Sequence, residues 1–531
     1  MAVSEARADT SAPEQGAAAV TWAPAPLTGS IRLLGTVALS LATFMNVLDV
    51  SIANVSIPAI AGDLGVSPDQ GTWIITSFAA ANGVSLPLTG WLTQRYGQVR
   101  LFTVSTILFV IASLLCGLAP SMELLIAFRV IQGAVAGPMI PLSQTLLLSS
   151  YPKEKAGTAL ALWGMTTLVA PVVGPVLGGW ITDNITWPWI FYINVPVGIV
   201  AAAMTWIIYQ KRESPRHKLP IDGVGLFLLA AWVGSLQVML DKGNDLDWFG
   251  SKMIIALAII AALGFALFCV WELTEAHPVV NLRLFAIRNF WTGTTALSLA
   301  YGAYFASIVL LPLWLQQYMG YTATLAGVAL APVGVLAILF TPFVGRNAQR
   351  IDPRLLATAS MVIFAIVAAM RGRLNPQADL ATIVLPTIIQ GAAVACFFIP
   401  LIGIALSDLK PEQIAAGSGL NNFVRITAGS FATSIVTTFW SHRASLHHAQ
   451  LAEHLTGYDP NATGAFAALQ SNGLSVDQAY SFGNTLVNQQ AFTMAALDVF
   501  NVSALLLVML IPVIWLAHRP AATSHAPASA E

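Results

Sequence analysis

The stretch IQGAVAGPMIPL (residues 131–142) returns in altered form as IQGAAVACFFIPL (residues 389–401), and this repeat decides the fold. Weaker matches at a similar offset pair AGTAL (156–160) with AGSGL (416–420), and residues 58–65 with residues 312–320. Chance similarity between apolar segments is the alternative explanation. Gln-Gly pairs and spaced prolines are not generic apolar sequence, however, so the repeat predicts two related halves.

The composition around this repeat defines the class of protein. Of 531 residues, 56% are hydrophobic and 9% are charged, whereas soluble domains carry about 25% charged residues. Apolar runs of about 20 residues are long enough for helices to cross a bilayer, and a β-barrel would instead show alternating segments of about 10. The net charge of −1 provides no basic field for nucleic acid. The sequence therefore predicts an all-α polytopic membrane protein.

Run length and charged or Pro/Gly breaks predict fourteen transmembrane helices. The predicted spans are 33–56, 71–92, 100–119, 122–148, 157–181, 188–209, 223–240, 252–272, 290–315, 325–346, 355–371, 380–406, 415–440 and 496–517. The repeated segments are eight spans apart, which indicates six helices, two inserted helices and six related helices. An even offset relates the halves by an axis along the membrane normal.

The distribution of positive charge predicts that both termini are cytoplasmic. With the N-terminus inside, 17 of the 24 Lys and Arg residues fall on the cytoplasmic side and 5 on the outer side, where Arg371 and Arg373 are counted. Arg129 and Arg425 lie within spans. The expected organisation is a disordered tail (1–30), a six-helix bundle (31–210), two inserted helices (211–275), a second six-helix bundle (276–517) with a long outer loop (441–495), and a tail (518–531).

Metal and enzyme chemistry have weak support in the sequence. The outer loop holds His442, His447, His448 and His454, for which a solvated helical loop is favoured over a metal site. The cysteines Cys116, Cys269 and Cys396 are scattered within apolar runs and form no ligand motif. No phosphate-binding loop, H-E-x-x-H or G-x-S-x-G motif occurs. We therefore expect no enzyme activity, no cofactor and no metal, and we expect an ion gradient to supply the energy.

Polar residues inside predicted spans are the candidate functional groups, because a charge in the bilayer centre is costly. Asp49 in the first span is a candidate proton carrier, since removal from water favours the neutral form of a carboxyl group. Pairing with a cationic substrate, or a structural hydrogen bond to a neighbouring helix, are the alternatives. Asn46 and Asn54 lie within two turns of Asp49 and are candidates for the same network.

Two spans of the repeat carry an arginine. Arg129 in the fourth span has Gln132 one turn on and on the same face, and a guanidinium stays charged at physiological pH. Arg425 in the thirteenth span lies beside Asn421 and Asn422. Either arginine could instead satisfy carbonyl groups of adjacent helices. The aromatic residues Tyr301, Tyr304 and Phe305 would complete a candidate substrate pocket, with lipid-facing positions as the alternative.

Two glycine-containing segments predict close contacts and turns. Residues 170–179 (APVVGPVLGG) contain Gly174, Gly178 and Gly179, which allow a close helix crossing, and Pro175, which bends a helix. Residues 90–100 (GWLTQRYGQVR) form a tight loop with Gly90 and Gly97, and with Arg95 and Arg100 as anchors. Generic helix packing and simple charge topology are the respective alternatives.

With these residues identified, the chain resembles the fourteen-span drug:proton antiporter family of the major facilitator superfamily, from about Leu33 to Trp515. The stretches that carry the resemblance are residues 48–58 (LDVSIANVSIP), 70–78 (QGTWIITSF), 129–148 (RVIQGAVAGPMIPLSQTLLL), 170–179, 187–198 (WPWIFYINVPVG) and 281–290 (NLRLFAIRNF). Two departures stand out. Gln94 replaces the usual Asp of the loop motif, so a charge-based latch there is in doubt, and Ala170 replaces the first Gly of the 170–179 motif.

The resemblance implies a role for each matched residue. Proton coupling falls to Asp49, Arg129 and Gln132, with Gly133 in the same motif. The antiporter motif is Ala170, Gly174, Pro175, Gly178 and Gly179, and the gating loop contains Gly90, Arg95, Gly97 and Arg100.

The resemblance also implies a function and partners. The implied function is proton-coupled export of hydrophobic toxic compounds through the inner membrane of a Gram-negative bacterium, together with a separate periplasmic adaptor protein and an outer-membrane channel. A dedicated exporter of one metabolite, such as a siderophore or fatty acid, is the alternative transport function. A transporter-derived receptor or scaffold is the alternative of a different class.

Overall fold

The computed structural model describes residues 25–519, except residue 67, residues 153–154, 217–219, 221, 244–245, 322, 348–349, 454 and 456–459. Every regular element in these residues is helical. The predicted tails fall mostly on residues 1–24 and 520–531, which lie outside the described part. Helix α1 already begins at Gly29, so the predicted tail is two residues too long.

The helices of the first half of the chain are as follows. They are α1 (Gly29–Asp63), α2 (Pro68–Gly71), α3 (Trp73–Ser85), α4 (Thr89–Tyr96), α5 (Gln98–Gly117), α6 (Met122–Ala136), α7 (Met139–Ser150), α8 (Ala156–Asn184), α9 (Trp189–Tyr192), α10 (Asn194–Tyr209), α11 (Gly223–Lys242) and α12 (Lys252–Thr274). Those of the second half are α13 (Arg288–Tyr318), α14 (Ala323–Leu330), α15 (Val333–Asn347), α16 (Pro353–Arg371), α17 (Leu380–Ala395), α18 (Phe398–Leu406), α19 (Ile414–Glu453), α20 (Pro460–Ser471), α21 (Val476–Met509) and α22 (Ile511–Trp515).

Local sequence signals set several of these helix boundaries. Asp222, Asp379 and Ser475 each accept a hydrogen bond from a backbone N–H in the first turn of α11, α17 and α21, which satisfies a donor that the helix leaves free. Gly97, with φ of +85°, ends α4 and allows the chain to turn directly into α5. Each terminus is therefore specified by a few polar or glycine residues between apolar runs.

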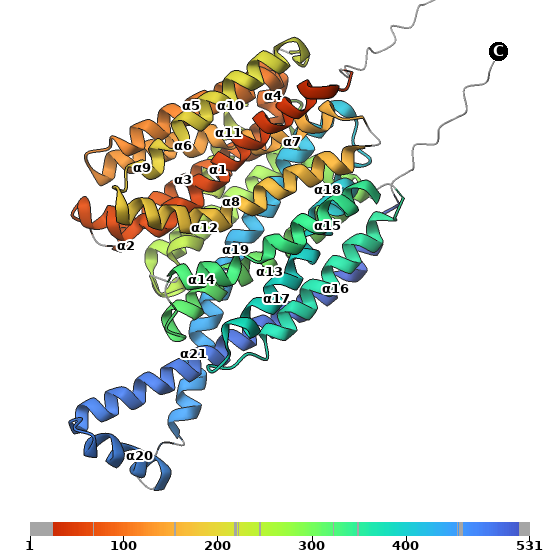
Figure 1. The fold of residues 1–531 in the computed structure, drawn as a ribbon. Helices are drawn as coiled ribbons and strands as arrows, with labels where there is room; N and C mark the ends of the chain where they lie inside the picture. Colours follow the sequence, from red (N-terminus) through yellow and green to blue (C-terminus); the bar gives the residue numbers. More distant parts are fainter. Residues whose placement is uncertain are drawn as a thin grey trace, which may run out of the picture.

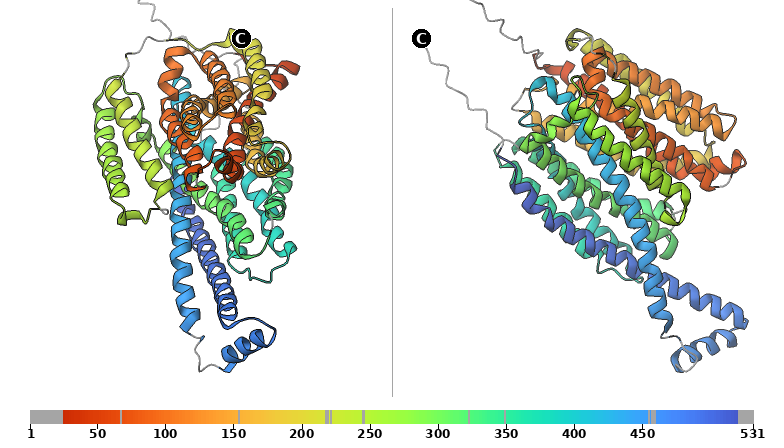
Figure 2. Two further views of the ribbon diagram at one scale, coloured as in Figure 1. Left: turned by 90° about the vertical axis from the view of Figure 1, so that its left-hand side faces the viewer. Right: turned by 180° about the vertical axis from the view of Figure 1, so that it is seen from behind.

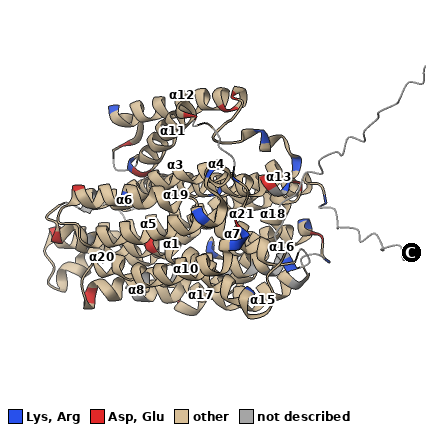
Figure 3. Ribbon diagram, turned by 90° about the horizontal axis from the view of Figure 1, so that it is seen from above, with Lys and Arg blue, Asp and Glu red and all other residues tan. Residues whose placement is uncertain are grey.

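Eleven helices or helix pairs among the described residues are long and apolar enough to cross a membrane. They cover eleven of the predicted spans, and the other three predicted spans fall on α3 with α4, on α8 and on α19. Figure 3 shows how few positions along these helices carry Lys, Arg, Asp or Glu. The structure is thus an all-helical protein with multiple membrane-crossing helices.

The packing order positions the candidate site. Helix α1 packs against α8 and α10, α5 packs against α6 and α10, and α3 packs against α6. In the second half, α13 packs against α19 and α18, and α16 packs against α17 and α21. Contacts between the two sets run through α19 with α7 and α4, and through α8 with α15 and α18. Helices α11 and α12 pair with each other beside α3 and α19 (Figure 1).

Helices α19, α20 and α21 form an extension that projects beyond the other helices, at the end opposite the described chain termini (Figures 1 and 2). The predicted outer loop 441–495 is therefore helical over most of its length. His447 contacts the Asp498 carboxylate at 2.8 Å, and His448 contacts the side-chain oxygen of Asn484 at 3.0 Å. His454 lies outside the described residues. Within the residues described, no cluster of three or more His, Cys, Asp or Glu side chains could hold a metal ion.

Candidate functional site

A buried ion pair links α1 to α6. The Arg129 Nη1 atom lies 2.5 Å from Asp49 Oδ2, and the exposed fractions of the two side chains are 0% and 1%. The same nitrogen donates to Gln132 Oε1 at 2.8 Å. Because Arg129 and Gln132 are three residues apart on α6, they face the same side and both reach Asp49. The three residues predicted for proton coupling therefore come together.

Two further amide groups complete the environment of the Asp49 carboxylate. Its Oδ1 atom accepts hydrogen bonds from Gln132 Nε2 at 3.1 Å and from Asn194 Nδ2 at 2.7 Å. Asn194, the first residue of α10, also donates to Ser113 Oγ at 3.0 Å, and Ser113 donates to the Phe191 carbonyl. Donors from α6 and α10 thus give the Asp49 carboxylate of α1 three side-chain hydrogen bonds, and α5 takes part through the contact of Ser113 with Asn194.

The rest of the Arg129 guanidinium is held by apolar and backbone groups. Its Nε donates to the Ile74 carbonyl of α3 at 3.0 Å, and its centre lies 4.3 Å from the Phe78 ring centroid and 5.6 Å from that of Phe191. Its Nη2 atom has no hydrogen-bond partner among the described residues. A buried ion pair of this kind is sensitive, because removal of either partner leaves the other charge uncompensated.

The two asparagines predicted near Asp49 have different positions. Asn46, one turn before Asp49, is buried and donates to the Ala136 carbonyl of α6 at 3.2 Å. Asn54 is exposed and makes no hydrogen bond to Asp49 in the structure. The prediction for Asn54 is wrong because five helical positions correspond to about 1.4 turns, which points its side chain away from Asp49.

A glycine contact joins α1 to α8 beside the ion pair. A Cβ atom at Gly174 would lie 2.5 Å from Ser51 Cβ, and one at Gly178 would lie 3.0 Å from the Ile52 carbonyl oxygen. At Gly179 it would make only an ordinary contact with Val55. Ala170 is fully buried on the same helix, whereas the side chain of Pro175 lies outside the described part. The predicted close crossing is thus present at Gly174 and Gly178.

We expect Gly174→Leu to disrupt this crossing. The added side chain has no space against Ser51, so α8 must move away from α1, at a cost of about 1–3 kcal/mol for an overpacked core. Thermal unfolding of the purified protein in detergent measures this loss. Gly179→Leu is the matched control, and an equal loss in both variants would contradict a specific role for the Gly174 contact.

The predicted loop of residues 90–100 is helical on both sides of Gly97, in α4 and in α5. Helix α4 contacts the second half of the chain. A Cβ atom at Gly90 would lie 2.6 Å from Ala416 Cβ, so α4 and the start of α19 are in direct contact. The Arg95 guanidinium lies 5.4 Å from the Trp91 ring centroid, and Arg100 is exposed. Glu213, which the sequence analysis did not single out, accepts hydrogen bonds from the backbone N–H groups of Val99 and Arg100.

A second polar cluster bridges the two halves. Arg425 donates to Asn422 Oδ1 at 2.8 Å, and its guanidinium lies 4.6 Å from the Tyr301 ring centroid. Asn422 Nδ2 approaches Gln144 Oε1 of α7 at 3.4 Å, and Ser418 donates to the same oxygen. The predicted grouping of Tyr301, Asn422 and Arg425 is thus observed, and Gln144 adds a contact from the other half.

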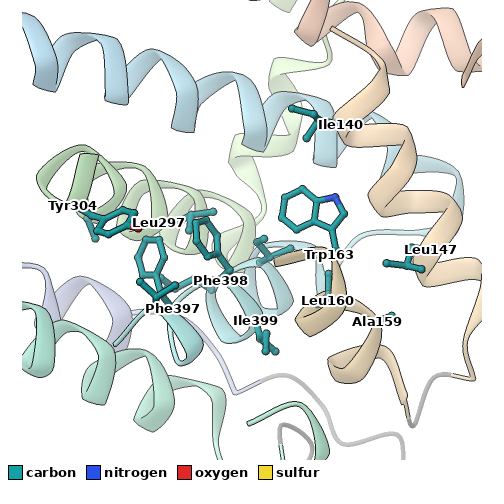
Figure 4. Close-up of a cluster of buried hydrophobic side chains, with 14 of the residues drawn as sticks. Ile140, Leu147, Ala159, Leu160, Trp163, Leu297, Tyr304, Phe397, Phe398 and Ile399 are labelled. Atoms are coloured by element: carbon teal, nitrogen blue, oxygen red, sulfur yellow. The ribbon is translucent and has the colours of Figure 1, made fainter. Parts of the chain in front are cut away.

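The other predicted pocket residues fall into two groups. The Phe305 ring stacks on the Tyr301 ring, with centroids 5.5 Å apart. Asn421 donates to Thr294 of α13. Tyr304 is buried against Phe364. Figure 4 shows Tyr304 beside Phe397, with Phe398 between these residues and Trp163 of α8. Apolar side chains from both halves therefore belong to one buried cluster, and Phe398 of this cluster also lies beside the Arg425 guanidinium.

Several functional candidates escaped the sequence analysis. Ser113 and Gln144 are uncharged polar residues in apolar spans, and the sequence contains no signal that separates them from other such residues. Asn194 does lie in a recognised motif, residues 187–198. Arg371 was counted as an outer-loop charge, but it lies in the last turn of α16 with 2% exposure. Hydropathy cannot separate the last turn of a helix from the adjoining loop.

The fold and the buried charge pair define the class of protein. Residues 39–433 match the family model described as Major Facilitator Superfamily, so the chain belongs to this family of membrane transporters. This confirms the predicted superfamily, and the chain is a transporter and not an enzyme.

The chain is also similar to individual known proteins. The chain is 50% identical over 501 residues to the multidrug export protein EmrB of Haemophilus influenzae, covering 94% of this chain and 98% of that protein. It is 47% identical over 495 residues to the fatty acid resistance protein FarB of Neisseria gonorrhoeae, covering 93% and 98%. A solved bacterial homologue of the human lysosomal transporter Spinster, inward-facing and occupied, aligns with a TM-score of 0.50 and 16% identity over 93% of this chain and 98% of that chain. This last likeness concerns the fold alone.

Proposed function

We propose that the protein is a proton-coupled multidrug efflux permease that exports hydrophobic toxic compounds. The observation that carries the proposal is the buried Asp49 carboxylate, which is paired with Arg129 and accepts hydrogen bonds from Gln132 and Asn194. The 50% identity to the multidrug export protein EmrB supports the substrate class. The proton gradient is the proposed energy source.

The geometry provides a route from proton binding to helix movement. Protonation removes the negative charge to which Arg129 is paired and weakens the acceptors used by Gln132 and Asn194. Because these donors lie on α6 and α10, their contacts with α1 change together when Asp49 changes charge. The Gly174 contact places α8 against α1 two residues beyond Asp49, so a shift of α1 is passed to the helix that contacts α15 and α18.

The proposed topology has fourteen spans with both termini in the cytoplasm. Residues 31–210 and 276–517 would form the two six-helix bundles, and residues 211–275 would supply the inserted pair. The positive charge of the loops and the internal repeat support this arrangement. Rocking of the bundles about a central cavity would expose it to each side in turn.

The proposed substrate pocket lies between the two bundles. Tyr301, Phe305 and Phe398 offer apolar and aromatic surface, and the cluster of Gln144, Asn422 and Arg425 offers polar contacts from both halves. A few polar groups in an aromatic setting suit hydrophobic compounds of varied shape. The contact of Asn422 with Gln144 would break when the bundles separate.

The proposed location is the inner membrane of a Gram-negative bacterium, with a periplasmic adaptor protein and an outer-membrane channel as partners.

The extension of α19, α20 and α21 is the proposed docking surface for the adaptor. It exposes large apolar side chains, and the sequence has no Lys or Arg between Arg443 and Arg519. The exposed side chains on it include Leu446, Tyr480, Phe482 and Leu486. A segment without basic residues is poorly suited to an anionic lipid surface, and a protein partner fits better.

Dedicated export of one metabolite, such as a siderophore or a fatty acid, is the second candidate. The 47% identity to a fatty acid resistance protein favours it more than it favours a receptor or scaffold. Under dedicated export, loss of the protein would stop secretion of one compound and leave resistance to unrelated drugs intact.

The direct test of multidrug export uses inside-out vesicles with an imposed proton gradient. We expect several unrelated hydrophobic drugs to dissipate the gradient in vesicles that contain the wild-type protein, because each exchange moves protons against drug. Vesicles without the protein are the control. Dissipation by one metabolite alone would favour dedicated export, and no dissipation by either kind of compound would contradict both transport proposals.

A further inference from the structure

Arg371 forms a second buried guanidinium site, in the other half of the protein. Its Nη1 donates to Ser307 Oγ at 2.8 Å, and its Nη2 donates to Thr387 Oγ1 at 3.0 Å and to Gln390 Oε1 at 2.8 Å. Its Nε is buried and has no hydrogen-bond partner among the described residues. Unlike Arg129, it forms no ion pair with any carboxylate in the described part of the chain.

The internal repeat relates this site to the Asp49 site. Gln390 follows Gln132 at an offset of 258 residues, which is the offset of the I-Q-G repeat. At the same offset, Ser307 follows Asp49, Thr387 follows Arg129, and Arg371 follows Ser113. Gln132 and Gln390 lie inside the matched I-Q-G segments, whereas the match of residues 58–65 with 312–320 has a smaller offset of 254–255, so the repeat itself pairs only the two glutamines of these sites.

The charges of the two sites differ. In the first site, Asp49 neutralises the guanidinium of Arg129. In the second site, the guanidinium of Arg371 donates only to the neutral side chains of Ser307, Thr387 and Gln390 among the described residues. The first site therefore has no net charge, and the second site has an uncompensated positive charge.

An uncompensated buried arginine needs an explanation. A guanidinium stays charged in proteins, and a charge inside the membrane is costly unless it is paired. Three neutral oxygen acceptors satisfy part of its hydrogen-bonding capacity but do not neutralise it. Its Nε N–H has no acceptor among the described residues and can donate to an anionic oxygen. The missing element is therefore an anion.

Buried aromatic side chains lie near the guanidinium on the same two helices. Tyr304 is one turn before Ser307 on α13, and Phe364 is two turns before Arg371 on α16. Their ring centroids are 5.2 Å apart, and Phe364 also contacts Phe397. A ligand with an anionic head and an apolar tail matches this order of charged and aromatic groups.

We propose that Arg371, Ser307, Thr387 and Gln390 bind the carboxylate of amphipathic anionic substrates. This site rests on the proposed export function and gives it a substrate class, with the apolar tail against Tyr304 and Phe364. An inorganic anion such as chloride has the same charge and is the other source of a counter-ion. Only the amphipathic anion would also use the aromatic surface.

The test measures ligand-dependent thermal stability of the purified full-length protein in an uncharged detergent. The probes are laurate, dodecanol and chloride. In the control for chloride, gluconate is the anion of the added salt. We expect laurate well above its Kd to raise the melting temperature of the wild type by about 2 °C or more, because ligand that binds only the folded state stabilises it. Dodecanol, with the same chain and no charge, should produce no comparable rise.

Ser307→Asp is the decisive variant. It places a carboxylate beside Arg371 Nη1, which now donates to Ser307 Oγ, so Arg371 gains an internal partner and the variant should fold at least as well as the wild type. We expect it to lose the laurate response, and Arg371→Lys to keep a weaker response. An undiminished laurate response in Ser307→Asp, or an equal response to dodecanol, would overturn the proposal. Stabilisation by chloride without a laurate effect would overturn the substrate assignment.

This binding test is separate from the test of export. It needs no proton gradient, so absence of laurate binding would leave drug-driven proton flux to be judged by itself. Absence of drug-driven flux in wild-type vesicles would overturn the proposed function, whatever the laurate response.

Discussion

Replacement of Asp49 by Asn is expected to abolish drug-driven proton flux and to reduce it to the level of vesicles without the protein. Asparagine has nearly the same shape and its side-chain oxygen still accepts a hydrogen bond, but it neither binds nor releases a proton. The neighbouring groups Gln132 and Asn194 can stay in place. Because Asp49→Asn also leaves the buried Arg129 guanidinium without its counter-ion, a loss of stability accompanies the loss of coupling, so vesicles with equal membrane levels of each protein are compared. The measurement is dissipation of an imposed proton gradient in inside-out vesicles.

Asp63→Asn is the matched control for this prediction. Asp63 is the last residue of α1, is exposed, and accepts a hydrogen bond from Trp187 Nε1 at 2.7 Å, which asparagine can also accept. We expect normal flux from this variant. Equal flux from the wild type and Asp49→Asn, at equal membrane levels, would show that the proton is carried elsewhere.

Replacement of Arg129 by Leu is expected to destabilise the protein by about 3–5 kcal/mol, because it leaves the Asp49 carboxylate buried without its cation. It also removes the Nε hydrogen bond to the Ile74 carbonyl and the contact with the Phe78 ring. Unfolding of the purified protein in mixed detergent, followed by tryptophan fluorescence, measures the loss. Arg216→Leu, at an exposed position, should change stability by less than about 0.5 kcal/mol.

A double variant separates pairing from packing. If the loss comes from the unpaired carboxylate, Asp49→Asn combined with Arg129→Leu should be more stable than Arg129→Leu alone, since no buried charge remains. The double variant should nevertheless transport nothing. Additive losses from the two substitutions would instead show that Asp49 and Arg129 stabilise the protein independently.

The sequence was most informative where a residue type is rare in its setting. Asp49 and Arg129 stand out because charges inside apolar spans are costly, and helical spacing placed Gln132 on the same face as Arg129. Proximity along a helix was a weaker guide, as Asn54 shows. Its distance from Asp49 in the sequence is short, but the helical rotation turns it away.

The residues that the sequence could not reveal depend on contacts between distant helices. Asn194 reaches Asp49 because α10 packs against α1, and Ser113 reaches Asn194 because α5 packs against α10. An isolated polar residue in an apolar span carries no signal of its partners. Gln144 contacts Asn422 across the two halves, a relation that no local pattern encodes. Arg371 was misplaced because the end of a helix and the adjoining loop have similar hydropathy.

The central claim is that Asp49 holds the proton that substrate binding displaces. The most direct measurement is proton release when a drug identified in the vesicle assay is added to purified, weakly buffered protein that contains a pH-sensitive dye. The account predicts release by the wild type and none by Asp49→Asn, with drug binding to both verified by equilibrium dialysis. Equal proton release by the two proteins would contradict the account.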